Sequence, residues 1–489
     1  MAKFLRALLL LALVCACTWA VVIIYWQEIH LAPSMDDVLL YLVALPLTIW
    51  ITFLVLRWLW RRRAEKRAAA ALAPTLGAAE PSSPAAAPAE KLQVVAAVAL
   101  TPLGEEVAAI VEALKAEPVP PLDAELLDQN GFPLSARRYA DLDLGLLPPD
   151  WSVDGEQPLP NAQARALALL AALLTRLDQP LAVLAACQQA NAPAVPKQKS
   201  AELNPAWLGE ISAAPEQVKT SYSVPARLQV QLLLEPGMDP ALEAPLSSWL
   251  TRLLAQQGLN EQQLQIELRS MPAKGLAKHL NALVDEIAPL KQPFAVLLLA
   301  AGSTVCQDVI DQGVLLERSQ NEAGMHFPGE AAAALLLANT AFALPDAKAL
   351  AQLGLSDLAE SDPLARTRPH AAKALPALLE RLTGRQSLPG ELAWVCSGLS
   401  LGPEAVEFAP LLTVAQASIQ VDEALHLRGA MGDAGLAGRL ASFALASQTV
   451  AEQGKAALLV LNDGLQERGL CLLDVVPEPA QADAAAASA

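Results

Sequence analysis

Residues 294–338 restrict the fold of this chain more than any other stretch, because they hold two apolar runs of strand length. The run Phe294 to Ala301 is uninterrupted and stops at Gly302-Ser303, and the run Ala331 to Ala338 follows Pro328-Gly329-Glu330. Apolar runs without polar alternation are typical of strands that are buried on both faces. The sequence therefore predicts a core sheet that is covered on both sides.

The rest of the chain alternates apolar runs with stretches of helical spacing. The runs predict further strands at 94–100, 180–187, 228–234, 263–268, 391–396, 456–461 and 469–475. Helices are predicted at 105–115, 162–177, 241–257, 275–287, 305–312, from 404 and at 438–446, with a helix-rich segment from 345 to 383. Residues 117–160 and 188–224 are predicted to be irregular. This alternation indicates an α/β fold with mostly parallel strands.

Two short segments carry a resemblance to a known family. Pro328-Gly329-Glu330-Ala331-Ala332 leads into an apolar strand, and Thr101-Pro102-Leu103-Gly104 joins a strand to a helix. Both resemble the β-ketoacyl synthases, although Ala331 replaces the second glycine of their Pro-Gly-Glu-Gly segment. The resemblance implies a thiolase-like two-half layered fold over residues 92–477, with a first half to about residue 344 and a second half at 345–477.

The resemblance also implies where a catalytic cysteine and two histidines would lie. A helix N-terminus lowers the pKa of such a cysteine, and the imidazoles stabilise charge on a thioester carbonyl. In this chain the corresponding positions are the elbow at Met271, Cys396 or Ser397 depending on the alignment, and Asp433. We therefore expect a degenerate site, a pseudoenzyme with no catalytic residues.

Glycines and their neighbours mark the turns that the resemblance implies. We expect Gly329 and Glu330 to form the entry to the second core strand, and Gly432 and Gly435 to form a turn before a helix. The glycine-rich stretch 429–438 lacks the Lys-Ser/Thr of a P-loop, so it is a weak phosphate-binding signal.

The remaining histidines and cysteines give no pattern of a metal or cofactor site. His30, His279 and His370 are expected to be solvated. His326 and His426 flank loops and are the better candidates for chemistry, although surface positions are expected for them too. Cys187 and Cys396 follow apolar residues and are expected to be buried small hydrophobic side chains, with a reactive thiol as the alternative.

The N-terminal region is predicted to anchor the chain in a membrane. Residues 7–26 and 38–56 are uncharged apolar runs long enough to cross a bilayer, and bases flank both outer ends. A cleaved signal peptide is the alternative for the first run, but a second run follows it. The positive-inside rule predicts a two-pass protein with both ends cytoplasmic, and we expect the membrane to be the bacterial inner membrane. An Ala/Pro-rich linker at 68–91 and a disordered tail at 478–489 are also predicted.

The charge of the chain argues against nucleic acid as a partner. The net charge is −17, and residues 1–67 hold eight bases and four acids, which leaves −21 for the remainder. Binding to phosphate backbones requires a basic surface.

Three functions fit the sequence. We favour a non-catalytic membrane-anchored adaptor or scaffold that binds a protein partner on the cytoplasmic side. The layout is similar to a bacterial family of adaptors for type VI secretion lipase effectors, which implies such an effector as partner. The alternative is a membrane-bound acyl-transferring or acyl-binding thiolase-like enzyme, and a third is an envelope-complex subunit whose spans do the specific work. The resemblance to thiolase-like proteins further implies a homodimer. No cofactor is expected.

Overall fold

The computed structural model describes Trp19 and residues 91–477, apart from residues 118, 141, 149–150, 154–156, 192–222, 226, 238–239, 314–325, 346–347, 361–373, 401–402 and 463–466. Contacts divide the chain into residues 1–86 and 87–489, and the fold below is that of the second unit. The predicted membrane spans, linker and tail lie outside the described residues, except for Trp19 and for Lys91 at the end of the linker. Among described helices, no single one is long and apolar enough to cross a membrane; a bent pair, 161–176 with 178–191, passes by length and composition.

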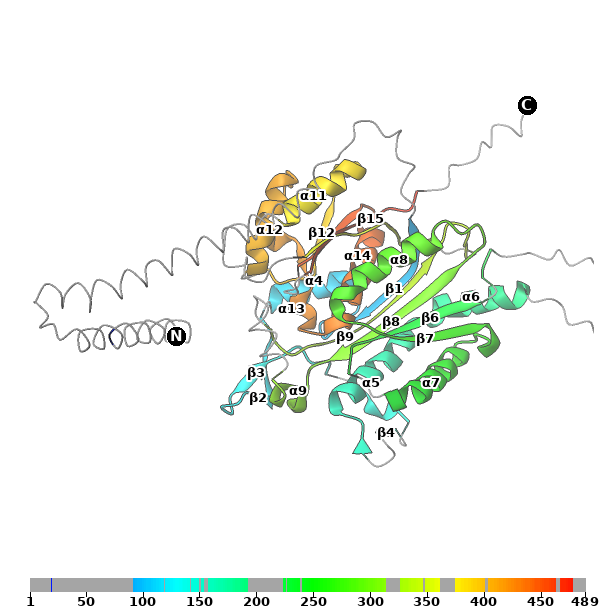
Figure 1. Cartoon of the computed structure of the whole chain (residues 1–489), viewed down its shortest axis with the longest axis horizontal. Helices are drawn as coiled ribbons and strands as arrows, with labels where there is room; N and C mark the ends of the chain where they lie inside the picture. The colour runs from blue at the N-terminus through cyan, green and yellow to red at the C-terminus, as the bar shows by residue number, and fades with distance from the viewer. Residues whose placement is uncertain are drawn as a thin grey trace, which may run out of the picture. The chain divides into compact units, whose positions relative to one another are not determined.

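A single mixed sheet of eleven strands runs through the domain (Figure 1). Its strands are β1 (Leu92–Leu100), β6 (Leu228–Leu234), β7 (Leu264–Ser270), β8 (Ala295–Ser303), β9 (Glu330–Ala338), β10 (Ala351–Leu353), β11 (Asp357–Glu360), β12 (Ala393–Cys396), β13 (Leu425–His426), β14 (Ala457–Leu461) and β15 (Glu467–Asp474). The order is β7-β6-β8-β9-β1 in the first half and β10-β15-β14-β12-β13 in the second, with β11 paired to β15. When the five main-path strands of each half are numbered 1 to 5 along the chain, leaving out β11, the first half has the spatial order 3-2-4-5-1 and the second half has the reverse order. This repeat confirms the two-half α/β arrangement.

The prediction of mostly parallel strands was wrong, because the sheet is mixed. Among the described strands, parallel pairing occurs between β6 and its neighbours β7 and β8, and between β12 and its neighbours β13 and β14. The last strand of each half, β9 or β15, is antiparallel to both of its main-path neighbours. A parallel neighbour requires a crossover connection back across the sheet, and these strands follow β8 and β14 without one.

Helices cover the sheet in three layers. They are α4 (Val107–Ala116), α5 (Asn161–Arg176), α6 (Asp178–Asn191), α7 (Glu243–Gln256), α8 (Leu276–Ile287), α9 (Gln307–Asp311), α11 (Ala374–Arg385), α12 (Pro403–Val414), α13 (Arg428–Met431) and α14 (Gly435–Gln453). One core joins α5, α6 and α7 to the first half of the sheet, and another joins α11 and α12 to the second half. The central core joins α8, α14 and α4 to strands of both halves. The sheet halves therefore enclose α8 and α14 (Figure 1).

The apolar runs at 294–301 and 331–338 correspond to β8 and β9, which pair with each other in antiparallel register from Ala295 with Ala338 to Ser303 with Glu330. All nine residues of β9 are buried. Alternate side chains of both strands contribute to the central core and to the core under α5. Burial on both faces explains why neither run shows polar alternation.

Three local predictions were wrong. Residues 180–187 form part of α6 rather than a strand, because Leu181, Leu184 and Ala185 lie on one helical face against the core. The segment from 345 to 383 contains β10 and β11 before α11, so it is less helical than expected. The irregular region at 117–160 contains two small hairpins, β2 (Leu122–Leu127) with β3 (Pro133–Ser135) and β4 (Ser152–Val153) with β5 (Gln157–Pro158).

Candidate functional site

The elbow between β7 and α8 carries Met271 where the resemblance places a cysteine. The backbone N–H of Met271 donates to the carbonyl of Leu234 at 2.9 Å, and its side chain packs against the central core. Behind it, buried Arg439 donates to the carbonyl of Ala273 at 3.3 Å and to the Glu467 carboxylate at 2.8 Å. A thioether has no proton to lose and cannot become a thiolate nucleophile. The elbow is a packed, ion-paired turn.

Cys396 and Ser397 lie at the end of β12 and join it to its neighbours. Cys396 is fully buried, and its carbonyl accepts a hydrogen bond from the N–H of Leu427 at 2.9 Å. Ser397 donates its N–H to Val460 at 2.9 Å, and its hydroxyl oxygen accepts from the N–H of Asn462 at 3.0 Å. Ser397 therefore fastens the ends of β12 and β14 together.

Asp433 belongs to a buried cluster of three charged or titratable side chains. Its Oδ2 lies 3.1 Å from Nδ1 of His326 and 3.9 Å from Nη2 of Arg428. Nη2 of Arg428 lies 2.5 Å from the same His326 nitrogen. The side chains of His326 and Arg428 are 1% and 5% exposed, so the cluster is packed away from water. The prediction that His326 is a surface residue was wrong.

Gly329 and Gly432 bring two distant segments into backbone contact. A Cβ on Gly329 would lie 1.9 Å from the carbonyl oxygen of Met431, and a Cβ on Gly432 would lie 2.6 Å from Cα of Gly329. Gly432 also has a φ of 64°, in the left-handed region that favours glycine. The Pro-Gly-Glu entry to β9 and the glycine-rich turn before α14 therefore meet at a point where no side chain fits.

Glu330 has no exposed surface, and three residues make four hydrogen bonds to its carboxylate. Arg165 of α5 contacts both carboxylate oxygens, with Nη2 at 2.9 Å from Oε2. The N–H of Tyr139 donates to Oε2 at 2.9 Å, and the Ser303 hydroxyl donates to Oε1 at 2.7 Å. A buried carboxylate needs such partners to remain charged. Glu330 thus ties α5 to the start of β9.

The N-terminus of α14 is capped by a side chain from the other half of the domain. Oε1 of Glu235, just after β6, accepts from the N–H of Leu436 at 2.7 Å. Gly435 has a φ of 57°, and a Cβ there would lie 1.7 Å from the same Oε1. A carboxylate at this position satisfies helix N-terminal donors and is favoured by the helix dipole.

The described cysteines are buried, as expected for Cys187 and Cys396. Burial raises the pKa of the Cys187 thiol above its ordinary value. Burial also raises the pKa of Cys471 to about 12. A thiol that stays protonated at neutral pH is a weak nucleophile.

Two histidines expected at the surface are buried inside the domain. His279 of α8 is 7% exposed; its Nε2 lies 2.8 Å from Oε1 of Gln231, and its Nδ1 lies 2.9 Å from Arg269. Burial, aided by the Arg269 charge, lowers the pKa of His279 to about 4. His426 is 6% exposed, and burial lowers its pKa against the opposing effect of the Val421 carbonyl. Both imidazoles are neutral at pH 7.

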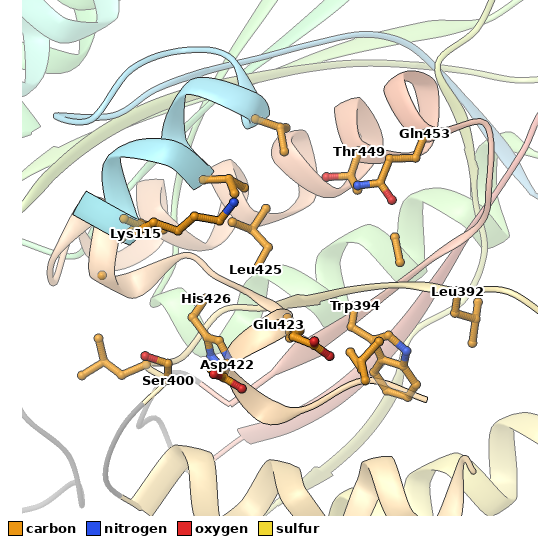
Figure 2. Close-up of a pocket in the computed structure, with 18 of the residues that line it drawn as sticks. Lys115, Leu392, Trp394, Ser400, Asp422, Glu423, Leu425, His426, Thr449 and Gln453 are labelled. Carbon is orange, nitrogen blue, oxygen red and sulfur yellow. The ribbon is translucent and has the colours of Figure 1, made fainter. Parts of the chain in front are cut away.

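A pocket of about 730 Å³ lies between α4 and the β12–β13 edge of the sheet (Figure 2). Apolar side chains dominate its walls, with Trp394 from β12 and Leu425 from β13 facing aliphatic residues of α4. Polar side chains lie among them, and Figure 2 shows Glu423 between His426 and Trp394. Its polar and charged lining residues are Lys115, Ser400, Asp422, Glu423, His426, Thr449, Gln453 and Lys455. A mostly apolar pocket of this size with few polar groups is typical of a small-molecule site.

Within the described ranges, no group of three or more His, Cys, Asp or Glu side chains has the geometry of a metal site. The positions expected from the family resemblance do not line the pocket either: Met271, Cys396, Ser397 and Asp433 lie elsewhere, while Gly429, four residues before Asp433, contributes to its wall.

No protein-family model matches the sequence, and the search of curated proteins gives no match. Among solved structures, the chain is similar to the ishigamide ketosynthase/chain length factor, with 13% identity, a TM-score of 0.48, and coverage of 79% of this chain and 100% of that one. It is also similar to a type II PKS acyl-carrier protein in complex with its ketosynthase, at 12% identity, a TM-score of 0.46, and coverage of 79% and 100%. OleA from Xanthomonas campestris matches at 11% identity, a TM-score of 0.34, and coverage of 52% and 73%.

At these identities and TM-scores, the likeness assigns neither a family nor an activity. The strand order that both halves repeat shows a two-half α/β fold with a mixed sheet.

Sequence reasoning did not find the pocket. Its lining comes from α4, β12, the segment 419–426 and the end of α14, which are far apart in the chain. The available signal was His426, which the sequence singles out as a histidine beside a loop. Its neighbours in space required the fold.

Proposed function

We propose that the domain binds an acyl chain in the pocket between α4 and the β12–β13 edge, without using a cysteine nucleophile. The observation that carries this proposal is the 730 Å³ volume with its mostly apolar lining and a smaller number of polar side chains. An acyl chain is a mostly apolar ligand with one polar group, which suits such a lining. The function is thus the acyl-binding alternative rather than the adaptor favoured from the sequence.

The walls of the pocket support a flexible apolar ligand. Val107, Val111 and Leu114 recur at helical spacing on one face of α4, opposite Trp394 and Leu425. Each Å² of apolar surface removed from water contributes about 25 cal/mol to the free energy of binding. Burial of apolar surface would therefore be the main driving force for binding an acyl chain in the pocket, and the polar lining residues would set its orientation.

The described thiols support binding rather than transfer. The four described cysteines are buried and none of them lines the pocket; they are Cys187, Cys306, Cys396 and Cys471. A transfer reaction through a thioester would need a thiolate that the acyl group can reach. We therefore propose binding without a covalent acyl intermediate.

A substitution that fills the pocket tests the proposal. The Val111→Trp variant places a large ring from α4 into the volume, and we expect labelling by a photoreactive diazirine alkyl probe to fall at least tenfold at residues 107–120, 392–400 and 419–426. The full-length protein would be held in lipid nanodiscs, because its N-terminal region is predicted to span a membrane. Labelled peptides would be mapped by mass spectrometry.

The matched control is Val406→Trp, since Val406 is 67% exposed on α12 and does not line the pocket. This variant should label as the unmodified protein does. Equal labelling of the pocket peptides in both variants, or their absence from the labelled set, would contradict acyl binding at this site. The partner-binding adaptor, with a type VI secretion effector, stays a prediction, and a pull-down from native membranes tests it.

A further inference from the structure

We infer that the outer face of α12 docks on the surface of a lipid bilayer. Five exposed or half-buried side chains make up this face, which we call the α12 face: Val406, Ala409, Pro410, Thr413 and Val414. Docking goes beyond acyl binding and does not require it. A docked α12 would also bring the pocket to a source of acyl chains, and that step alone rests on the proposed function.

The α12 face has the spacing of one side of a helix. Its members follow Val406 by three, four, seven and eight residues. The opposite side of α12, with Phe408, Leu411 and Leu412, lies in the core against β12. Val406 is 67% exposed and Val414 is 47% exposed. A helix with apolar side chains on all sides is normally buried on all sides, so the exposed α12 face indicates a contact surface.

The α12 face carries no charge, although the net charge of the chain is −17. From residue 405 to residue 421 the sequence has one charged residue, Glu407. Glu407 is 6% exposed, and its carboxylate oxygens bind Arg468 at 2.6 and 3.1 Å. Membrane surfaces with anionic lipids repel exposed carboxylates at short range. A neutral, apolar face is therefore the kind of surface by which an acidic domain can approach a bilayer.

The size of the α12 face favours a bilayer over a protein as the occupant. A stable protein interface takes about 20–30 residues from each partner, and five side chains fall far short of that. The predicted spans end at residue 56 and β1 begins at Leu92, which leaves the 35 residues 57–91 between them. A flexible chain of this length spans on the order of 30 Å. A domain tethered so closely meets the membrane at high effective concentration, and a small apolar contact is then sufficient.

α12 also connects two segments that line the pocket. Leu399 and Ser400 precede the helix, Ile419 follows it, and all three are lining residues. Figure 1 shows α12 beside α11, next to β12. A bilayer on the α12 face would thus lie close to one wall of the pocket.

The test uses the full-length protein in nanodiscs of dioleoylphosphatidylcholine with a small fraction of a phosphatidylcholine that has a diazirine on its acyl chain. After irradiation we expect lipid adducts on peptides from 405–421, mapped by mass spectrometry. Val414→Asp places a charge on the α12 face, so these adducts should fall about fivefold or more. Val406→Trp keeps the face apolar and should retain them. Val406→Asp repeats the test, should Val414→Asp fold poorly.

The matched control is Val475→Asp, since Val475 is 43% exposed, lies outside α12 and gives the same change in net charge. This variant should label as the unmodified protein does. Absence of adducts on 405–421, or an equal loss in Val414→Asp and Val475→Asp, would overturn docking. A fall from two copies to one in Val414→Asp, without lipid adducts in the unmodified protein, would instead make the α12 face an interface between copies.

The alkyl probe of the acyl-binding test separates the two proposals, with pocket peptides taken from 107–120 and 392–400. Lipid adducts on 405–421 without labelling of the pocket by that probe would uphold docking and reject acyl binding. Pocket labelling without adducts on 405–421 would leave acyl binding standing and overturn docking.

Discussion

Met271, Ser397 and Asp433 each hold neighbouring segments together. Met271 fills the central core at the β7–α8 elbow, Ser397 joins β12 to β14, and Asp433 contacts His326 and Arg428. Side chains of these kinds contribute packing and hydrogen bonds at positions where the resemblance expected nucleophile and imidazole chemistry. These contacts agree with the hypothesis of a degenerate site. The role of each residue stays a prediction.

The buried thiols give a prediction about reactivity. With an acyl-thioester analogue, we expect the unmodified protein and the Cys187→Ala, Cys396→Ala double variant to be modified equally. The physical reason is that both thiols are buried, with the pKa of Cys187 raised by that burial. Peptide mapping by mass spectrometry measures it. Modification that disappears in the double variant would instead support the acyl-transferring enzyme.

The backbone contact between Gly329 and Gly432 gives a prediction about stability. Gly329→Ala should lower the free energy of unfolding by more than about 3 kcal/mol, because its Cβ would overlap the carbonyl of Met431. Gly384→Ala is the control: nothing lies within 4 Å of its Cβ position in α11, so alanine should stabilise by about 0.5–1 kcal/mol. Denaturant titration followed by circular dichroism measures the free energy of unfolding of both variants. Similar effects of both substitutions would show that the close approach is not restrictive.

At the scale of elements, α8 is joined to the first half of the sheet by a ring of polar side chains. Gln231 accepts from His279 and lies 3.3 Å from Glu267, which in turn binds Arg269 at 2.7 Å, and Arg269 returns to His279 at 2.9 Å. Each member is satisfied by the next, which is the condition for a buried polar network to be tolerated. The ring replaces apolar packing on this part of the inner face of β6 and β7.

The ring makes stability depend on pH. The pKa of His279 falls from 6.5 in the unfolded chain to about 4 in the fold, so the unfolded chain binds more protons between these values. Its contribution is therefore fully present above pH 6.5 and is lost as the pH falls to 4. We expect this loss to be roughly 2 kcal/mol, since the partly exposed Arg269 and Glu267 admit some solvent screening.

His279→Gln should remove that part of the dependence, because glutamine does not titrate. The measurement is the free energy of unfolding of both proteins at several pH values from 4 to 7. The difference between them should change by about 2 kcal/mol across this range. A constant difference would mean that His279 has the same pKa in the folded and unfolded chain.

At the scale of the whole molecule, the two sheet halves share α8 and α14. The central core takes side chains from β1, β8 and β9 of the first half and from β12, β14 and β15 of the second. α14 is buried along most of its length, as a helix between two sheets must be. The halves therefore depend on each other for burial, and neither has a complete core by itself.

This arrangement predicts that residues 87–489 fold as one cooperative unit when expressed without residues 1–86. We expect a single thermal transition by circular dichroism with the same midpoint at different wavelengths. Two separate transitions would show that the halves unfold independently. Sedimentation of the same protein would test the homodimer that the family resemblance implies.

Much of the fold could be predicted from the sequence, because local patterns specify local structure. The apolar runs that became β8 and β9 have no polar alternation, and the spacing of Leu276, Leu280 and Leu283 fits a helix with one buried face. The prediction failed at 180–187, where a short apolar run fits either a strand or a buried helix and only the surrounding core decides.

Strand direction and the pocket were decided by the tertiary structure. The apolar runs of β9 and β15 predict buried strands but not the direction of either strand. Their antiparallel pairing depends on how the chain returns to the sheet. The pocket exists because α4 lies opposite the β12–β13 edge of the sheet. These two segments are about three hundred residues apart in the chain. The sequence by itself determined which apolar residues are buried in most of the strands and helices, since burial follows the periodicity of apolar side chains. Which polar groups meet across the chain, as His326 and Asp433 do, follows from long-range packing that no local pattern encodes.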